Sequence, residues 1–391
     1  MDEQKTPKKK THWLVRLLAF LVTLALVAGA IFLIANRDLL NLDAWKRYIN
    51  YRTLERSDSG QAASFAYSGS SSDVIAALGN DLLVCSEGGI RLYSGSGVCY
   101  VDESVILEEP AAEICGDTAA VYSVGGDAIY LYRDRAQYHV LSDLNGQLLS
   151  VRLNSSGWLA VTAREGSYKA VITIYDDELN KRMAFRLSSA YVTDAVVTED
   201  CKSLATVSIG QNGTVFESTL SFYDLPDSRN GSVDYDLTPT ATHTLGNNVI
   251  LEVDGTSSIW CVGDTGVSVW DGKNVGSWSC QGKYLKAYSV SDAFAAMLIG
   301  KYQTGSQAEL YTIDHQGEPS VGRVINEQIL SLSAAGRYVA VLTADRLDIY
   351  TQDLEIYAVL DGTDDAQKVL MRDDGTALLI GSGTASLYVP D

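Results

Sequence analysis

The fold that this sequence predicts is an all-β, eight-bladed β-propeller preceded by one N-terminal transmembrane helix, with seven blades as the alternative. Three observations lead to this prediction: one short pattern repeated eight times, polar turns between apolar strands, and one long apolar run near the N-terminus. The pattern reads apolar–x–apolar–aromatic, and a strand-like repeat of about 40 residues is typical of four-stranded propeller blades. Its aromatic positions, 38 to 48 residues apart, are Tyr93, Tyr132, Tyr175, Tyr223, Trp270, Tyr311, Tyr350 and Tyr388.

The N-terminal segment predicts a membrane anchor. Residues 13–35 are almost unbroken apolar, and about 20 such residues cross a bilayer core of about 30 Å. The basic tail, residues 1–12, is expected to stay in the cytoplasm and to leave the rest of the chain outside. A cleaved signal peptide ending near Ala28-Gly29-Ala30 is the alternative, although the apolar run is longer than such a peptide needs.

The segments that follow are predicted as a juxtamembrane amphipathic helix (36–56), a Ser/Gly-rich linker (57–72) and the propeller itself (73–391). The linker contains one strand-like stretch, Ala63–Ser68, and the last repeat ends too near the C-terminus to hold a fourth strand. We expect Ala63–Ser68 to supply that strand and close the ring, because an open edge invites aggregation. Seven blades would follow if the stretched region 212–247 is not a blade of its own.

Within most repeats, a polar turn separates the first two apolar strands, as at Asp254-Gly255 and Ala335-Gly336-Arg337. Gly, Asn, Asp and Ser are the residues that tight antiparallel turns require. Apolar residues on both faces of the inner strands fit blades that pack against a neighbour on each side. The repeated aromatic residues are therefore expected to fill the spaces between blades, with ligand stacking as the alternative.

Charge is divided unevenly along the chain. The formal net charge is −19, yet basic residues outnumber acidic ones in residues 1–56, so the propeller is more acidic than the whole. A domain of this sign repels phosphates, and no nucleic acid partner is expected. The acidity serves solubility in one interpretation and the binding of cations or a basic partner in the other.

The six cysteines all fall in the predicted propeller. Cys85 and Cys99 are placed in the second and fourth strands of one blade, and Cys261 and Cys280 likewise in another. Such strands lie about 10 Å apart, beyond the reach of about 7 Å that a disulfide allows. Buried, inert thiols are expected, and without a CxxC motif neither a zinc ribbon nor a redox pair is supported.

The units made of a first strand, a turn and a second strand, such as residues 153–161 and 332–341, resemble those of WD40-like and quinoprotein-like propellers. With the basic N-terminus and the single apolar run, the chain is similar to single-pass envelope proteins of Gram-positive bacteria whose propeller ectodomain has no established function. The WD dipeptide occurs once among the repeats, at Trp270-Asp271, rather than as a repeated set. The resemblance implies an architecture and an envelope location, and it assigns no functional residue.

No catalytic, cofactor or metal motif stands out. The four histidines are not at metal-ligand spacing, and there is no P-loop or dinucleotide fingerprint, so no cofactor is expected. A glycan hydrolase needs two carboxyl groups about 5–10 Å apart, and so acidic a domain offers many chance pairs. Converging carboxylates in the central channel would favour an enzyme, whereas a filled channel would favour a scaffold.

The candidate partner-binding residues lie in three long hairpins between second and third strands, at residues 164–169, 210–217 and 300–307. In a propeller these hairpins share one face, and longer loops on a rigid scaffold are where recognition is often built. Neutral variation of the surface is the alternative. The candidates are Arg164, Tyr168, Lys169, Gln211, Phe216, Tyr302 and Gln303.

Together these features predict a membrane-anchored, extracytoplasmic propeller that acts as a non-catalytic binding or scaffold module. Its partner would be a protein or another component of the cell envelope. Two other functions stay open: an envelope glycan hydrolase, and a ligand sensor that signals through a membrane partner because the cytoplasmic tail is too short to signal itself.

Overall fold

The structure is a computed structural model that describes residues 13, 17–18, 20–24, 27, 42–52, 54, 57, 60–225, 238–255, 258–363 and 365–390. The chain divides into two compact units, Met1–Thr53 and Leu54–Asp391. The first contains α2 (Leu42–Tyr51), which falls within the segment predicted as a juxtamembrane helix. The predicted tail, residues 1–12, and most of the predicted span, residues 13–35, lie outside the described residues. No helix among the described residues is long and apolar enough to cross a bilayer.

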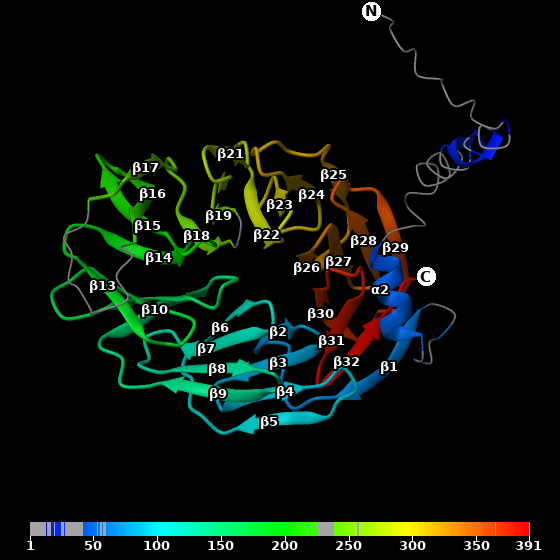
Figure 1. The fold of residues 1–391 in the computed structure, drawn as a ribbon, viewed down its shortest axis with the longest axis horizontal. Helices are drawn as coiled ribbons and strands as arrows, with labels where there is room; N and C mark the ends of the chain where they lie inside the picture. The colour runs from blue at the N-terminus through cyan, green and yellow to red at the C-terminus, as the bar shows by residue number, and fades with distance from the viewer. Residues whose placement is uncertain are drawn as a thin grey trace, which may run out of the picture. The chain divides into compact units, whose positions relative to one another are not determined.

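The described residues of the second unit form eight four-stranded antiparallel sheets, the blades of one propeller (Figure 1). Blade one contains β2 (Val74–Leu78), β3 (Asp81–Ser86), β4 (Gly89–Tyr93) and β5 (Cys99–Glu103), and blade two contains β6 (Pro110–Cys115), β7 (Thr118–Ser123), β8 (Ile129–Arg133) and β9 (Ala136–Leu141). Blade three contains β10 (Gln147–Leu153), β11 (Leu159–Arg164), β12 (Ala170–Tyr175) and β13 (Lys181–Leu187). Blade four contains β14 (Tyr191–Val197), β15 (Ser203–Asn212), β16 (Val215–Asp224) and β17 (Ala241–Thr244). Blade five contains β18 (Ile250–Asp254), β19 (Ile259–Gly263), β20 (Gly266–Trp270) and β21 (Val275–Ser279). Blade six contains β22 (Tyr284–Val290), β23 (Ala295–Gly300), β24 (Ala308–Ile313) and β25 (Arg323–Ile325). Blade seven contains β26 (Ile329–Ala335), β27 (Tyr338–Thr343), β28 (Arg346–Thr351) and β29 (Ile356–Asp361). Blade eight is β30 (Ala366–Met371), β31 (Ala377–Gly381), β32 (Thr384–Tyr388) and β1 (Gln61–Ala66). The prediction of eight blades is confirmed, and seven is excluded.

The first strand of each blade faces the centre of the ring and the fourth lies at the periphery (Figure 1). The antiparallel order then places two kinds of connection on one face, which we call the hairpin face: the hairpins between second and third strands, and the links between blades. The opposite face, which we call the turn face, carries the turns between first and second and between third and fourth strands. Each recognition loop therefore has a fixed place on one of two faces.

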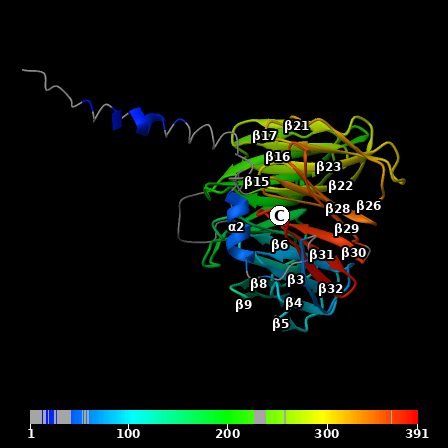
Figure 2. The ribbon, with the colours of Figure 1, turned by 90° about the vertical axis from the view of Figure 1, so that its right-hand side faces the viewer.

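The ring is closed by the strand that precedes the first blade. β1 pairs antiparallel with β32, and Figure 2 shows β32, β31 and β30 side by side near the C-terminus. The predicted strand, Ala63–Ser68, is therefore correct in kind but two residues late. A bulge between Gln61 and Ser64 carries the pairing back to Tyr388, whereas Tyr67 follows the strand and donates its hydroxyl hydrogen to the Gly381 carbonyl at 2.9 Å.

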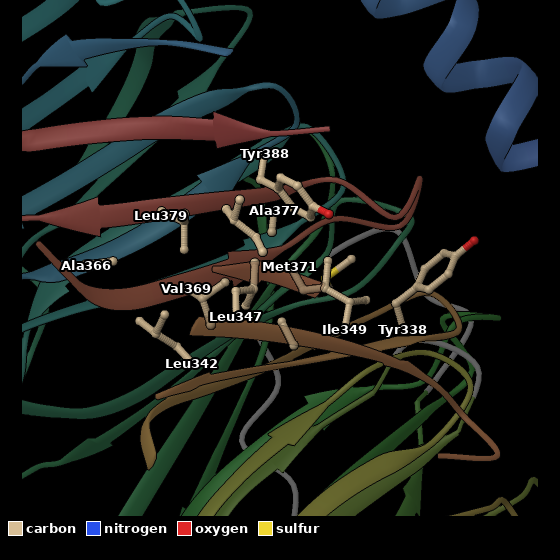
Figure 3. Packing of buried hydrophobic residues seen from close by; sticks show 12 residues of the cluster. Tyr338, Leu342, Leu347, Ile349, Ala366, Val369, Met371, Ala377, Leu379 and Tyr388 are labelled. Atoms are coloured by element: carbon tan, nitrogen blue, oxygen red, sulfur yellow. The ribbon is translucent and has the colours of Figure 1, made fainter. Parts of the chain in front are cut away.

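The repeated aromatic residues pack between blades, as predicted. Tyr388 at the end of β32 is buried in a cluster that joins blades seven and eight, and Figure 3 shows it with Leu379 and Met371 near Leu347 and Ile349 of β28. The second strands are buried on both faces: in β3 every residue from Asp81 to Cys85 is buried. Burying one such Leu or Ile side chain contributes about 1.5–3 kcal/mol, and the repetition gives a rigid ring.

All six cysteines lie in the described residues and all are free. Cys85, Cys261 and Cys280 are buried, and burial raises the pKa of the Cys85 thiol to about 12, so it is inert at neutral pH. The expectation of burial is wrong for Cys99, which is exposed on the outermost strand of blade one. Cys280 follows β21 by one residue rather than belonging to it.

Candidate functional site

The three hairpins chosen from the sequence lie between β11 and β12, between β15 and β16, and between β23 and β24. Their aromatic side chains point to solvent: Tyr168 is 38% exposed, Phe216 60% and Tyr302 64%. Gln303 and Arg164 are exposed as well. Side chains this exposed contribute little to the core, so they are available for contacts with another molecule.

The second hairpin differs from the prediction of a loop at residues 210–217. β15 and β16 continue as a two-stranded ribbon to Asn212 and Val215, and Gln211 is paired directly with Phe216. Gly213 has a φ of 66°, which the two-residue turn between Asn212 and Val215 requires. Such a tight turn lets the two strands stay paired up to the tip of the hairpin. Phe216 and Gln211 therefore share one side of a rigid ribbon.

Several of the exposed rings carry a cation over their face. The pairs, measured from cation to ring centroid, are Arg186 over Tyr168 at 5.9 Å, Lys169 over Tyr191 at 4.5 Å and Lys301 over Tyr302 at 5.4 Å. The Lys169 ammonium also donates to the Ser189 carbonyl at 3.2 Å. Such contacts, worth about 0.5–1 kcal/mol each at exposed sites, hold ring and charge together at the surface.

The structure brings some of the predicted residues together and leaves others apart. Blades three and four are neighbours, so their hairpins adjoin, whereas blade five separates them from the hairpin that carries Tyr302. Sequence reasoning missed two further aromatic residues on this face, Tyr191 and Tyr284, which begin the first strands β14 and β22 and are 57% and 53% exposed. An aromatic residue at the first position of a first strand, where the strand meets the hairpin face, is the signal that would have found them.

The inner rim of the hairpin face contains β-bulges at equivalent positions of successive blades. Among the described strands, the first strands of blades three to eight each have a bulge within their first four residues. The residues that it leaves unpaired are Leu149, Thr193, Leu251, Lys286, Leu330 and Gln367. A bulge turns a side chain away from the sheet, and Leu251 and Leu330 are exposed in this way beside the channel.

The interior of the channel is occupied by charged side chains that sequence reasoning did not single out. Arg152 on β10 donates to Glu113 of blade two at 2.9 Å and, through Nη2, to Asp194 of blade four at 2.8 Å. All three side chains are largely buried. Their signal in the sequence is a single charged residue in each of three first strands that otherwise carry no charge.

Burial determines the protonation of this cluster. It raises the pKa of Glu113 to about 8, and the Arg152 guanidinium opposes this shift only in part. Burial also raises the pKa of Asp254, at the turn-face end of β18. The buried Arg152 cation offsets the charge of one carboxylate, Asp194, so the carboxyl group of Glu113 holds its proton at neutral pH.

Hydrogen bonds between first strands tie the rest of the inner wall. The Ser289 hydroxyl accepts from the Ala334 amide at 2.9 Å, and the Ser333 hydroxyl accepts from the Met371 amide at 2.9 Å. The Lys368 ammonium donates to the Asp73 carbonyl at 2.9 Å, joining the last blade to the first. These bonds brace the wall against rearrangement.

At the turn face, a pocket of about 290 Å³ opens at the end of the channel. Asp254, Asp292 and Asp373 line it together with Cys115. Among the described residues, no group of three or more His, Cys, Asp or Glu side chains is arranged to hold a metal ion. The pocket presents carboxyl groups without a cofactor-binding pattern.

A family model described as "Family of unknown function (DUF5711)" matches residues 46–375. The chain belongs to this family. No curated protein sequence matches it. The C-terminal WD40 domain of Sif2 superposes with a TM-score of 0.54 at 12% identity, over 80% of this chain and 93% of that one. BamB from Moraxella catarrhalis gives a TM-score of 0.48 at 14% identity, over 85% and 97%. At 12% identity, the likeness to the Sif2 domain agrees with the propeller fold of this DUF5711 member and shows nothing beyond the fold.

The buried Glu113 of this DUF5711 propeller predicts a pH-dependent stability. Its pKa is raised from about 4.5 to about 8, so between these values the folded chain holds a proton that the unfolded chain releases. Stability should therefore fall as pH rises from about 5 to 8, by up to about 1.4 kcal/mol per pH unit, and level off above. Chemical denaturation at several pH values gives the free energy of unfolding of wild type and of Glu113→Gln. The prediction is contradicted if this free energy changes with pH equally in both proteins.

Proposed function

We propose that this chain is a non-catalytic binding or scaffold propeller whose hairpin face engages a protein or another component of the cell envelope. The observation that carries the proposal is the set of exposed aromatic side chains, Tyr168, Phe216 and Tyr302, raised on hairpins above a rigid ring. Aromatic side chains are enriched among the residues that dominate binding energy, and they lose little conformational freedom on binding. The fold by itself would not support this step, since propellers serve many functions.

The proposal places the propeller outside the cell, attached through residues 13–35 with the N-terminus in the cytoplasm. The apolar run and the basic tail before it support this location. A tethered propeller with one exposed working face is suited to holding a partner near the membrane.

Replacing Tyr168, Phe216 and Tyr302 together with Ala is expected to abolish capture of the partner from an envelope extract. Each truncation of a binding hot spot commonly costs about 2 kcal/mol or more, and a combined loss of about 4 kcal/mol already weakens binding about a thousandfold, which prevents capture. The measurement is a pull-down with the full-length chain, read by mass spectrometry against wild type.

The matched control replaces Tyr100 and Tyr138, which are exposed on the outer strands β5 and β9, with Ala. That variant should capture the partner as wild type does. Unchanged capture by the hairpin variant would refute the proposed face. Loss of its folded circular-dichroism spectrum would show instead that these rings belong to the core.

An envelope glycan hydrolase is the second candidate, because carboxyl groups do converge in the channel. Asp254 has a raised pKa and lines an open pocket, as a general acid would. Against this, Glu113 and Asp194 are both engaged by Arg152 and brace three blades. An assay for reducing ends released from envelope glycans distinguishes the two candidates.

A further inference from the structure

The hairpin face is divided by charge into two sectors. In blades three to six, which we call the basic sector, the cations are Arg164, Lys169, Arg186, Lys283, Lys286 and Lys301. The acidic residues of this sector are fewer: Glu165, Glu217, Asp264 and Glu309. In blades seven, eight, one and two, which we call the acidic sector, carboxylates such as Glu87, Glu108, Glu109, Asp127, Asp345 and Asp361 dominate. The basic sector thus has the opposite sign to a chain of net charge −19.

Three cations of the basic sector, Arg164, Lys169 and Lys301, lack a carboxylate partner among the described residues. Lys283, by contrast, is paired with Glu309 at 2.7 Å. In the acidic sector the cation Arg346 contacts Glu327 at 3.4 Å. Cations without a carboxylate partner, in a chain this acidic, are available to pair with an acidic ligand.

Exposed aromatic residues gather in the same sector. Among the described residues of the hairpin face, the exposed rings are Tyr168, Tyr191, Phe216, Tyr284 and Tyr302, all in blades three to six. Leu251, which a bulge turns out of β18, is 54% exposed between the rings of β14 and β22. Apolar anchors interleaved with cations match a ligand that carries both carboxylates and apolar side chains.

We propose that the basic sector binds a short acidic protein segment, with apolar side chains of that segment docked beside Tyr191, Leu251 and Tyr284. Its carboxylates pair with Arg164, Lys169 and Lys301. The acidic sector beside it repels any polyanion long enough to cross both sectors, which excludes extended nucleic acid and an anionic membrane surface in favour of a short peptide. This inference rests on the proposed function and names the chemistry of the partner.

The test uses the full-length chain in non-ionic detergent and a random twelve-residue peptide library displayed on phage. We expect the selected peptides to combine Asp or Glu with Leu, Phe, Tyr or Trp, although the protein itself is acidic. Selection of basic peptides, which net charge alone would favour, would overturn the proposal.

Charge reversal then locates the site. The variant with Arg164→Glu, Lys169→Glu and Lys301→Glu should bind a labelled selected peptide at least about tenfold more weakly in an anisotropy titration. The matched control, Lys181→Glu, Lys202→Glu and Lys273→Glu, makes the same change in net charge on the turn face and should bind within about twofold of wild type. Both variants should melt near wild type. Equal weakening by the two variants would show a long-range effect of net charge and overturn the proposed site.

Two further outcomes separate this inference from the proposed function. A single-stranded oligonucleotide of the same length should not displace the peptide, and full displacement would show a general anion site instead. If the aromatic variant loses the envelope partner but the charge-reversed variant keeps it, the hairpin face binds a partner and the acidic segment is refuted. If neither loses the partner, both proposals fail.

Discussion

Deleting residues 61–66 from the full-length chain is expected to destabilise the propeller by at least about 3 kcal/mol. The deletion removes β1, whose pairing with β32 closes the ring. It also removes the buried Phe65, worth about 1.5–3 kcal/mol, and several ladder hydrogen bonds of about 1 kcal/mol each. Phe65 also packs against Gly97 of blade one, so the strand joins the last blade to the first.

The free energy of unfolding in denaturant measures this effect, and gel filtration should show association through the bare edge of β32. Within the strand, Phe65→Ala should account for about 3 kcal/mol, whereas Ser64→Ala, at an exposed position beside it, should cost almost nothing. A deletion variant that unfolds at the wild-type denaturant concentration would show that β1 does not hold the ring closed.

Replacing Arg152 with Met should destabilise the propeller by about 3–5 kcal/mol. The substitution leaves Asp194 buried without its cation and Glu113 without its donor, and an uncompensated buried charge is more costly than the loss of the pair itself. Denaturant unfolding at pH 7 is the measurement.

The neutral double variant separates charge from packing. Arg152→Met combined with Asp194→Asn removes both partners of the 2.8 Å contact and should recover most of the lost stability. If the double variant is as unstable as the sum of the single ones, the guanidinium acts by filling the channel, and the electrostatic explanation is wrong.

The number of blades could be predicted because each third strand buries its alternate apolar residues between neighbouring blades. That burial requires an apolar residue at alternate positions and an aromatic residue at the end, as in Ile172 to Tyr175 of β12. The existence of a closing strand followed from counting strands in the last repeat. Its bounds did not, because the bulge near Gln61 depends on pairing with Tyr388, 327 residues further along the chain, and has no local signature.

The candidate site was predictable in part. Hairpin length and composition indicated Tyr168, Phe216 and Tyr302, since exposure at a hairpin tip is a local property. Tyr191 and Tyr284 were not predicted, because the first strand of a blade is expected to be buried. Only the arrangement of the ring shows that the beginning of this strand, at the hairpin face, reaches solvent.

The sequence by itself determined the repeated blade, the polarity of its turns and the acidity of the propeller, because periodicity and composition are properties of short stretches of chain. Only the tertiary structure decided that Arg152 joins Glu113 and Asp194, residues 39 and 42 positions away. It also divided one face into a basic and an acidic sector. Both features arise when the ring brings separate blades side by side, and the free energy of such contacts depends on distances in space that no local pattern encodes.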